Sequence, residues 1–433
     1  MTRILAVACL LVLAPRGVLS AQSVPDTLSL AALRAAALNS DPRAAQLEIL
    51  AAQSALRLRN IGAELRPVLS LLGQGQYQSD VASIPVNLPG VSIPMPPHDT
   101  YDAHLAAQQR LYDPSTSARR AVERAQTTES QSRVRTALYG ITESVNTAFF
   151  TALRSQAQIA ELETTITDLE AQLSVATERV AVGTALQGER NTLRAEILRR
   201  QQTVEEQRAL RRAALAILSD LVGRRIDSAA SLSLPDLANE AASARTSLDI
   251  LRNRPEYAQF ARSREVLERM EEARGAQDKP RVSAFGRAGY GRPGLNPLSD
   301  QFESYWLTGV QLQWTPWNWG ATRRDRQIST LQRQILATEE QAFTAAIGRS
   351  IEQDLASIDR LQAALIQDEE IIALRVSILS EARTRYAESV ITSAEYVDRQ
   401  TDMLAARLAR AIHRVELSQA RAHLLTTLGI EVR

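Results

Sequence analysis

Two long stretches of this 433-residue sequence contain no proline, and they constrain the fold more than any other feature. None of the 16 prolines lies in 115–234 or 317–433, which are 120 and 117 residues long. Because proline is the residue that most reliably breaks a helix, both stretches can form helices of unusual length. Aromatic residues make up only 4% of the chain, although they usually contribute much of the buried area of a large globular core. Both observations favour an elongated helical body.

The charge and the cysteine content exclude several classes of function. The net charge is +1, whereas nucleic-acid binding usually needs a basic face, so no nucleic acid is expected as a partner. Lys279 is the only lysine, which leaves no P-loop lysine and no plausible Schiff-base site. Cys9 is the only cysteine, and the four histidines show no ligand spacing. These counts exclude lysine chemistry, an intrachain disulfide framework and a cysteine-rich metal site, and we expect no metal and no cofactor.

Residues 1–21 have the features of a secretory signal peptide. Arg3 supplies a positive charge, Ile4–Ala14 is apolar, and small residues precede the end of the segment. A lipoprotein signal acylated at Cys9 is the alternative, but only five apolar residues would precede that cysteine. After residue 21 no window holds 18 consecutive apolar residues, so the sequence predicts no transmembrane helix.

The chain repeats itself once over nearly its whole length, which indicates duplication of a large unit. At an offset of 213, Pro67 matches Pro280 and Tyr77 matches Tyr290. Further pairs at offsets of 213, 205 and 206 are Gly73/Gly286, Tyr112/Trp317, Arg179/Arg385, Glu189/Glu395 and Gly223/Gly429. The predicted division is a first repeat at 22–223, a linker or equatorial segment at 224–246 and a second repeat at 247–433.

Each repeat is predicted to contain the same elements in the same order. A first helix, at about 29–63 and 247–275, ends before a proline. Two strands follow, at about 67–77 and 101–112 in the first repeat and at about 280–290 and 305–316 in the second. Long helices broken once in the middle complete each repeat, at about 115–221 and 321–428.

The four short segments alternate with a period of two, as strands with one apolar face do. The clearest case places Val282, Ala284, Gly286, Ala288 and Tyr290 on one face. The opposite faces carry arginine, glutamine, aspartate and histidine, which suits a water-filled lumen, and aromatic residues stand at the ends of the apolar faces, as in an interfacial girdle. The predicted membrane-interface aromatics are Tyr77, Tyr101, Tyr112, Tyr290, Trp306, Trp314, Trp317 and Trp319. A half-buried sheet in a soluble domain would alternate in the same way and is the alternative.

Four strands cannot close a membrane barrel, because the smallest known ones have eight. Open sheet edges cannot face lipid either. If the strands lie in a membrane, the chain must therefore assemble with further copies, and the strand count alone does not choose between two and three.

The long helical stretches have the pattern of coiled coils. From Thr322 to about Arg385, apolar residues recur at spacings of three, four and seven, with charged residues between them. A helix of this length would span roughly 95 Å at 1.5 Å per residue, which is far too long for a compact domain. A returning helix from about Ser393 to Leu428 is expected to pack back along it.

This duplicated layout resembles the TolC-like outer-membrane efflux proteins over essentially the whole mature chain. The residues that carry the resemblance are Pro67 and Pro280 before strands, Leu111-Tyr112-Asp113 and Pro316–Gly320 after them, and Val182-Gly183-Thr184 at a helical turn. The resemblance implies a mainly α fold with a small membrane β-barrel part. Three copies would each give four strands to a shared twelve-stranded barrel, and their long antiparallel coiled coils would form a periplasmic tunnel.

The resemblance also implies a function and partners. Such homotrimers lie in the bacterial outer membrane among its lipids, extend into the periplasm and act as exit ducts of tripartite efflux or type I secretion systems. They dock on a periplasmic adaptor (a membrane fusion protein) and an inner-membrane transporter, and do no chemistry themselves. A soluble periplasmic coiled-coil scaffold or adaptor without a pore is the alternative.

The family's adaptor-contact tips correspond here to two turns within Arg179–Glu189 and Arg385–Glu395. The first turn keeps the Val-Gly-Thr pattern at Val182, Gly183 and Thr184. The second has Ser389, Val390 and Ile391, so a serine appears where the resemblance leads one to expect glycine. Glycine adopts a left-handed backbone freely, whereas serine does so only at a cost.

The resemblance further implies a gate at the far end of the tunnel. Glu395 and Asp398 are one helical turn apart, and in a trimer they would form a ring of six carboxylates that attracts cations. Tyr386 and Glu189 match a tyrosine–acid contact that closes the gate in the family. The arginine that usually strengthens this contact is replaced by Ile391. A plain solvated helix face is the alternative interpretation of the two carboxylates.

Overall fold

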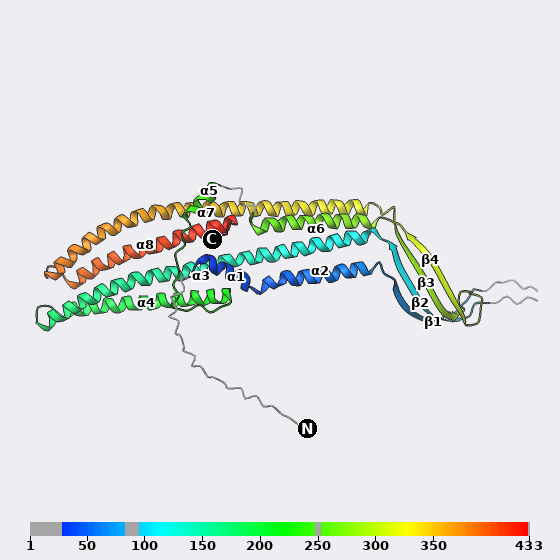
Figure 1. Cartoon of the computed structure of the whole chain (residues 1–433), viewed down its shortest axis with the longest axis horizontal. Coiled ribbons are helices and arrows are strands. Elements are labelled where there is room, and N and C mark those ends of the chain that lie inside the picture. The colour runs from blue at the N-terminus through cyan, green and yellow to red at the C-terminus, as the bar shows by residue number, and fades with distance from the viewer. Residues whose placement is uncertain (1–27, 83–94, 247–252, 432–433) are drawn as a thin grey trace, which may run out of the picture.

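The computed structural model describes residues 28–82, 95–246 and 253–431. The predicted signal peptide at 1–21 lies outside these residues. The chain forms a long layer of helices with a four-stranded sheet at one end (Figure 1). Within the described ranges, no helix combines the length and the hydrophobicity that a bilayer-spanning helix requires.

Two helices run the whole length of the helical layer. They are α3 (Pro114–Ala181) and α7 (Ala321–Ala387), with 68 and 67 residues. Each lies in a proline-free stretch, apart from Pro114, which stands in the first turn of α3, where its missing N–H costs nothing. At 1.5 Å per residue each is about 100 Å long. The prediction of long helices is therefore confirmed.

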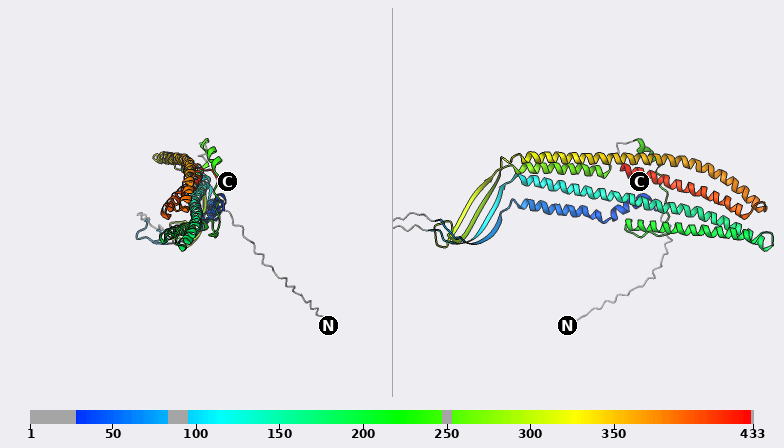
Figure 2. Two further views of the ribbon diagram at one scale, coloured as in Figure 1. Left: turned by 90° about the vertical axis from the view of Figure 1, so that its left-hand side faces the viewer. Right: turned by 180° about the vertical axis from the view of Figure 1, so that it is seen from behind.

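Shorter helices flank the two long ones, as Figures 1 and 2 show. Near the sheet, α2 (Gln46–Ala63) packs on α3, and α6 (Pro255–Gln277) lies between α3 and α7. At the far end, α4 (Gln187–Val222) packs on α3, and α8 (Ser393–Leu428) lies between α3 and α7. The order across the layer is thus α2-α3-α6-α7 near the sheet and α4-α3-α8-α7 away from it, so that α2 and α4 form one edge and α7 forms the other.

The first predicted helix, at about 29–63, is interrupted in the structure. Helix α1 (Leu30–Ser40) ends before Pro42, a short 3-10 helix η1 (Pro42–Ala45) follows, and α2 begins at Gln46. Pro42 has no N–H to continue the hydrogen bonds of α1, and the Asp41 carboxylate accepts a hydrogen bond from the Arg43 N–H instead. The linker at 224–246 also contains a helix that was not predicted, α5 (Ala238–Thr246).

The sheet contains β1 (Val68–Tyr77), β2 (Asp99–Tyr112), β3 (Arg281–Arg292) and β4 (Glu303–Gln313), in the order β1-β2-β3-β4 and antiparallel throughout. Each strand joins one helix of the adjoining layer, so the strand order repeats the helix order. Strand β4 ends earlier than predicted, before Pro316, because proline restricts the residue before it and cannot donate to a sheet.

The main apolar core lies midway along the helical layer. It joins α1, α3, α4, α7 and α8 with the linker, and Phe149, Phe150 and Leu218 are fully buried in it. Arg34 of α1 is also buried there, and its guanidinium donates to Asn146 Oδ1 at 2.5 and 2.8 Å and to Thr426 Oγ1 at 3.1 Å. Burial lowers the pKa of Arg34 to about 10, so the side chain stays charged near neutral pH. The network fixes α1 to α3 and α8.

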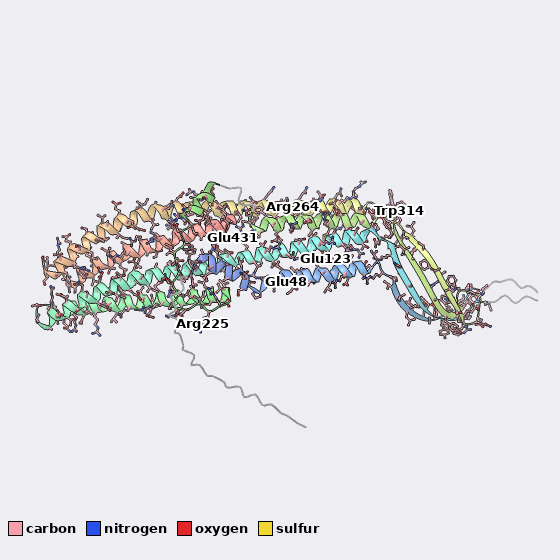
Figure 3. The ribbon with its side chains drawn as sticks, in the orientation of Figure 1. Glu48, Glu123, Arg225, Arg264, Trp314 and Glu431 are labelled. Carbon is pink, nitrogen blue, oxygen red and sulfur yellow. The ribbon has the colours of Figure 1, made fainter. Side chains whose placement is uncertain are left out.

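Ion pairs connect the helices nearer the sheet, where the apolar core is thinner. Arg57 of α2 lies 3.5 Å from Glu123 of α3, and Arg264 of α6 lies 2.7 Å from Glu340 of α7. Figure 3 shows the side chains along the whole layer, with Glu123 and Arg264 labelled. It also shows Trp314 at the junction between the sheet and the helices.

Candidate functional site at the helical tips

The end of the molecule away from the sheet consists of two helical hairpins. Helices α3 and α4 are joined through 182–186, and α7 and α8 through 388–392. These turns lie within the two ranges predicted as adaptor-contact tips, and Val182, Gly183, Thr184 and Val390 are exposed at them. Ile391 is partly buried and packs against an apolar cluster between the hairpins.

The two turns have the same backbone geometry. In the first, Gly183 N–H donates to the Val180 carbonyl at 3.1 Å and Thr184 N–H to the Arg179 carbonyl at 2.9 Å. In the second, Ser389 N–H donates to the Tyr386 carbonyl at 3.1 Å, and Val390 N–H donates to the Arg385 carbonyl at 2.8 Å. This is the Schellman pattern, which requires a left-handed residue after the helix. Gly183 and Ser389 occupy that position, with φ values of 77° and 62°.

The candidate selectivity residues follow the second turn on α8. Glu395 and Asp398 are both exposed. The Glu395 carboxylate accepts hydrogen bonds from Thr392 N–H at 2.8 Å and from Thr392 Oγ1 at 3.1 Å, and Glu395 N–H donates to Thr392 Oγ1. This capping box lowers the pKa of Glu395, chiefly through the Thr392 N–H. Glu395 is therefore ionised at neutral pH and held at the first turn of the helix.

The candidate closing contact differs from the prediction in its details. Tyr386 is buried, and its ring stacks on Tyr396 with centroids 5.2 Å apart. Burial raises the pKa of Tyr386, and the charge of Glu189 raises it further, so the two predicted partners interact electrostatically. At the tips themselves, the hydrogen bonds between the hairpins come from Arg179, which donates to the carbonyls of Tyr386 at 3.3 Å and Ala387 at 2.5 Å.

From the sequence, Arg179 is placed at the start of the first tip with no contact assigned to it, and Tyr396 is not singled out. The repeat aligns Arg179 with Arg385, but Arg385 pairs with Glu381 of its own helix at 2.5 Å. The two arginines have different partners because of how one hairpin packs on the other. The aligned sequence gives no signal for this packing.

The predicted membrane-interface aromatics lie at the opposite end of the molecule. All eight are exposed: Tyr77, Tyr101, Tyr112, Tyr290, Trp306, Trp314, Trp317 and Trp319. Trp306 is on β4, Trp314 follows the end of that strand, and Trp317 packs edge-on against Trp319 with centroids 6.0 Å apart. In the described parts of the chain, no group of three or more His, Cys, Asp or Glu side chains could hold a metal ion.

No protein-family model and no curated protein matches the sequence. Several solved structures match its fold. The outer membrane protein VceC of Vibrio cholerae superposes with a TM-score of 0.66 and 16% identity over 93% of this chain and 97% of VceC. The CmeC outer membrane channel of Campylobacter jejuni superposes with a TM-score of 0.64 and 14% identity over 92% of this chain and 85% of CmeC. The MtrE outer membrane channel of Neisseria gonorrhoeae, in its open state, superposes with a TM-score of 0.66 and 15% identity over 93% of this chain and 89% of MtrE. The chain therefore has the fold of TolC-like outer-membrane channels.

Proposed function

We propose that the protein is a passive outer-membrane channel, an exit duct from periplasm to exterior that assembles as a homotrimer. The observation that carries this proposal is the pairing of an exposed apolar sheet face with two unpaired edges that run the length of the molecule. A single chain leaves both the apolar face and the two edges uncovered, whereas a closed ring of copies in a membrane would cover them.

One face of the sheet is apolar across all four strands. The register places Leu71, Leu105, Ala288 and Trp306 in one row across the sheet. Neighbouring rows on the same face include Leu69, Ala107, Ala284, Val310 and Leu312. Leu69, Leu71, Leu105, Trp306, Val310 and Leu312 are all exposed. A contiguous exposed apolar face of this kind marks a surface that contacts a partner or lipid.

The opposite face is mostly polar and internally bonded, although the register also places Leu72, Phe285 and Leu307 on it. On it, His104 Nδ1 lies 2.5 Å from Asp102 Oδ2, and Tyr305 Oη donates to the same carboxylate. The Tyr305 ring reaches Asp102 across Gly289, where a Cβ atom would lie 3.0 Å from the ring and 2.5 Å from His104 Cβ. A polar face opposite an apolar one is the arrangement of a barrel that has lipid outside and water inside.

The exposed apolar side chains of the helical layer are concentrated on its two edges. On the described helices, every large exposed apolar side chain except Val175 belongs to α2, α4 or α7. Those on α2 and α4 are Ile49, Leu56, Leu198, Leu210 and Ile217. Those on α7 are Ile328, Leu331, Ile335, Ile366, Ile371, Leu374, Val376 and Ile378. Because the two edges differ, copies would join head to tail, and such contacts close into a ring when the rotation from one copy to the next completes a full turn.

The same ring would complete the sheet. Strand β4 of one copy would lie beside β1 of the next, and the alternating strand directions make that pair antiparallel. Three copies would give the twelve-stranded barrel that the resemblance implies. No edge would then face lipid, where unpaired N–H and C=O groups are too costly.

The tips would form the gate and the docking end. Six carboxylates from Glu395 and Asp398 of three copies would surround the axis and favour cations. The turns at Val182–Thr184 and Ser389–Ile391 would contact a periplasmic adaptor, which connects the channel to an inner-membrane transporter. The eight exposed aromatic residues would lie where the sheet meets the lipid headgroups.

The test is reconstitution of the full mature chain. Protein extracted from outer membranes in detergent should have the mass of a trimer, dissociate only on heating, and conduct ions in planar bilayers. A mature chain that is monomeric and fully soluble without detergent would overturn the proposal and favour the soluble scaffold.

A further inference from the structure

The polar face of the sheet carries two pairs of an aromatic residue and a glycine, both between β3 and β4. The register places Tyr305 directly opposite Gly289 and Phe285 directly opposite Gly309. A Cβ atom on Gly309 would lie 2.7 Å from Cζ of Phe285, and a Cβ atom on Gly289 would lie 3.0 Å from Cζ of Tyr305. Each ring therefore fills the space of a missing side chain and lies against the backbone of the opposite strand.

Arg287 lies between these two pairs on the same face. The register places it opposite Leu307 of β4 and opposite Ala106 of β2, one row away from each aromatic ring. Arg287 and Leu307 are both exposed. The neighbours of the guanidinium on this face are therefore apolar or aromatic: Leu307, Ala106, Phe285 and Tyr305.

Within the described ranges, Arg287 forms no ion pair. The two acidic residues on this face of the described strands are engaged elsewhere, since Asp102 accepts a hydrogen bond from Tyr305, and Glu303 accepts one from Ser299 at 2.8 Å. A neighbouring copy would supply no partner either, because β1, which would lie beside β4 in the proposed ring, contains no charged residue. An anion that pairs with Arg287 must therefore come from solution.

The other arginines on this face of the described strands lie at the end next to the helices, and their guanidinium groups are occupied. Arg110 lies 2.6 Å from Glu64. Arg281 donates to the Gln277 carbonyl at 3.1 Å. Arg287 is thus the arginine of this face whose donors remain available to a ligand.

The first repeat does not reproduce this arrangement. At the offset of 213, Arg287 corresponds to Gln74, and Phe285 corresponds to Leu72. Each chain therefore has the arrangement once, and a ring of three copies would have it three times.

A guanidinium binds a carboxylate through two parallel N–H donors, and a flat apolar surface favours an aromatic ring. We propose that Arg287, with the floor formed by Phe285, Tyr305 and Leu307, is a binding site for aromatic carboxylates on the wall of the lumen. This inference rests on the proposed function, because the polar face lines a lumen only in the ring of copies. It deepens that function by naming a class of cargo that the duct would carry.

The experiment measures dissociation constants by saturation-transfer NMR, with the trimer of the mature chain in phosphatidylcholine nanodiscs. The probe is 4-fluorobenzoate. Acetate, which lacks the ring, and 4-fluorobenzamide, which lacks the charge, should both bind more weakly. Arg287→Gln should weaken the binding of 4-fluorobenzoate by about tenfold, because hydrogen bonds between charged groups are lost. Phe285→Ala should weaken it by about threefold, because the aromatic contact is lost.

Arg281→Gln is the matched control, since it removes an arginine from the same face of the same strand whose guanidinium is already bonded. It should bind 4-fluorobenzoate like the unsubstituted trimer, and Arg287→Lys should fall between that trimer and Arg287→Gln. Equal affinity of Arg287→Gln and the unsubstituted trimer, or 4-fluorobenzamide binding as tight as that of 4-fluorobenzoate, would overturn the inference and leave the proposed function intact. A mature chain that neither trimerises nor conducts ions would contradict the proposed function, and the lumenal site with it.

Discussion

Gly183 and Ser389 occupy the same left-handed position in the two tip turns, with φ values of 77° and 62°. The hydrogen bonds around them are equivalent, residue by residue, at an offset of 206. The first half of the duplicated chain therefore has glycine at the left-handed position of the Schellman turn, whereas the second half has serine there. A left-handed backbone costs a non-glycine residue roughly 1–2 kcal/mol.

Ser389→Gly should stabilise the second tip. The substitution removes the left-handed penalty, but glycine loses about 0.5–1 kcal/mol through the greater freedom of the unfolded chain. The net gain of about 0.5–1 kcal/mol should slow amide exchange in the turn by about threefold. Gly183→Ser is the reciprocal change and should speed exchange in the first turn. An unchanged rate in both variants would show that the left-handed residues are not strained.

The stability of the α7–α8 pair should fall as pH rises above the ordinary histidine range. His423 Nδ1 lies 2.8 Å from both carboxylate oxygens of the buried Asp354, and this hydrogen bond raises the pKa of His423 above 6.5. A folded-state pKa above the unfolded value gives stability that is fully present below 6.5 and is lost as pH rises through the folded-state pKa. Denaturant unfolding between pH 6 and about 9 should show this loss, and His423→Gln should flatten it.

An acidic substitution at an edge of the helical layer should prevent assembly. Leu210 of α4 is exposed in the single chain and would be buried against a neighbouring copy. Leu210→Glu would bury an unpaired charge there and should convert the trimer to monomers in detergent. Val182→Glu, at a more exposed apolar position on the first tip, is the control and should remain trimeric. Trimers of both variants would show that the edge is not an interface.

The carboxylates on α8 should set the ion selectivity of the channel. Glu395→Gln with Asp398→Asn removes two charges per copy, while glutamine can still serve in the capping box with Thr392. The double variant should lose cation preference and block by divalent cations in planar bilayers, without a change in the helicity of α8. Selectivity equal to that of the unsubstituted protein would place the constriction elsewhere.

Local sequence rules predicted the elements well and the contacts between them poorly. Period-two alternation located the four strands, and the absence of proline located α3 and α7, because both patterns are consequences of backbone geometry. The break at Pro42 was missed because the apolar pattern continues past it. The roles of Arg179 and of the Tyr386–Tyr396 stack depend on which helix faces which, and two arginines at equivalent repeat positions give no hint of it.

The measurement that tests the account most directly is quenching of tryptophan fluorescence by brominated phospholipids. All four tryptophans lie within 306–319, and a Trp314→Phe/Trp317→Phe/Trp319→Phe variant leaves only Trp306, which is 74% exposed on the apolar face of β4. If this face meets lipid, quenching of Trp306 should be strong with bromine at the headgroup end of the acyl chain, and aqueous iodide should have little effect. Strong quenching by iodide without quenching by the brominated lipid would contradict the membrane assignment of the sheet.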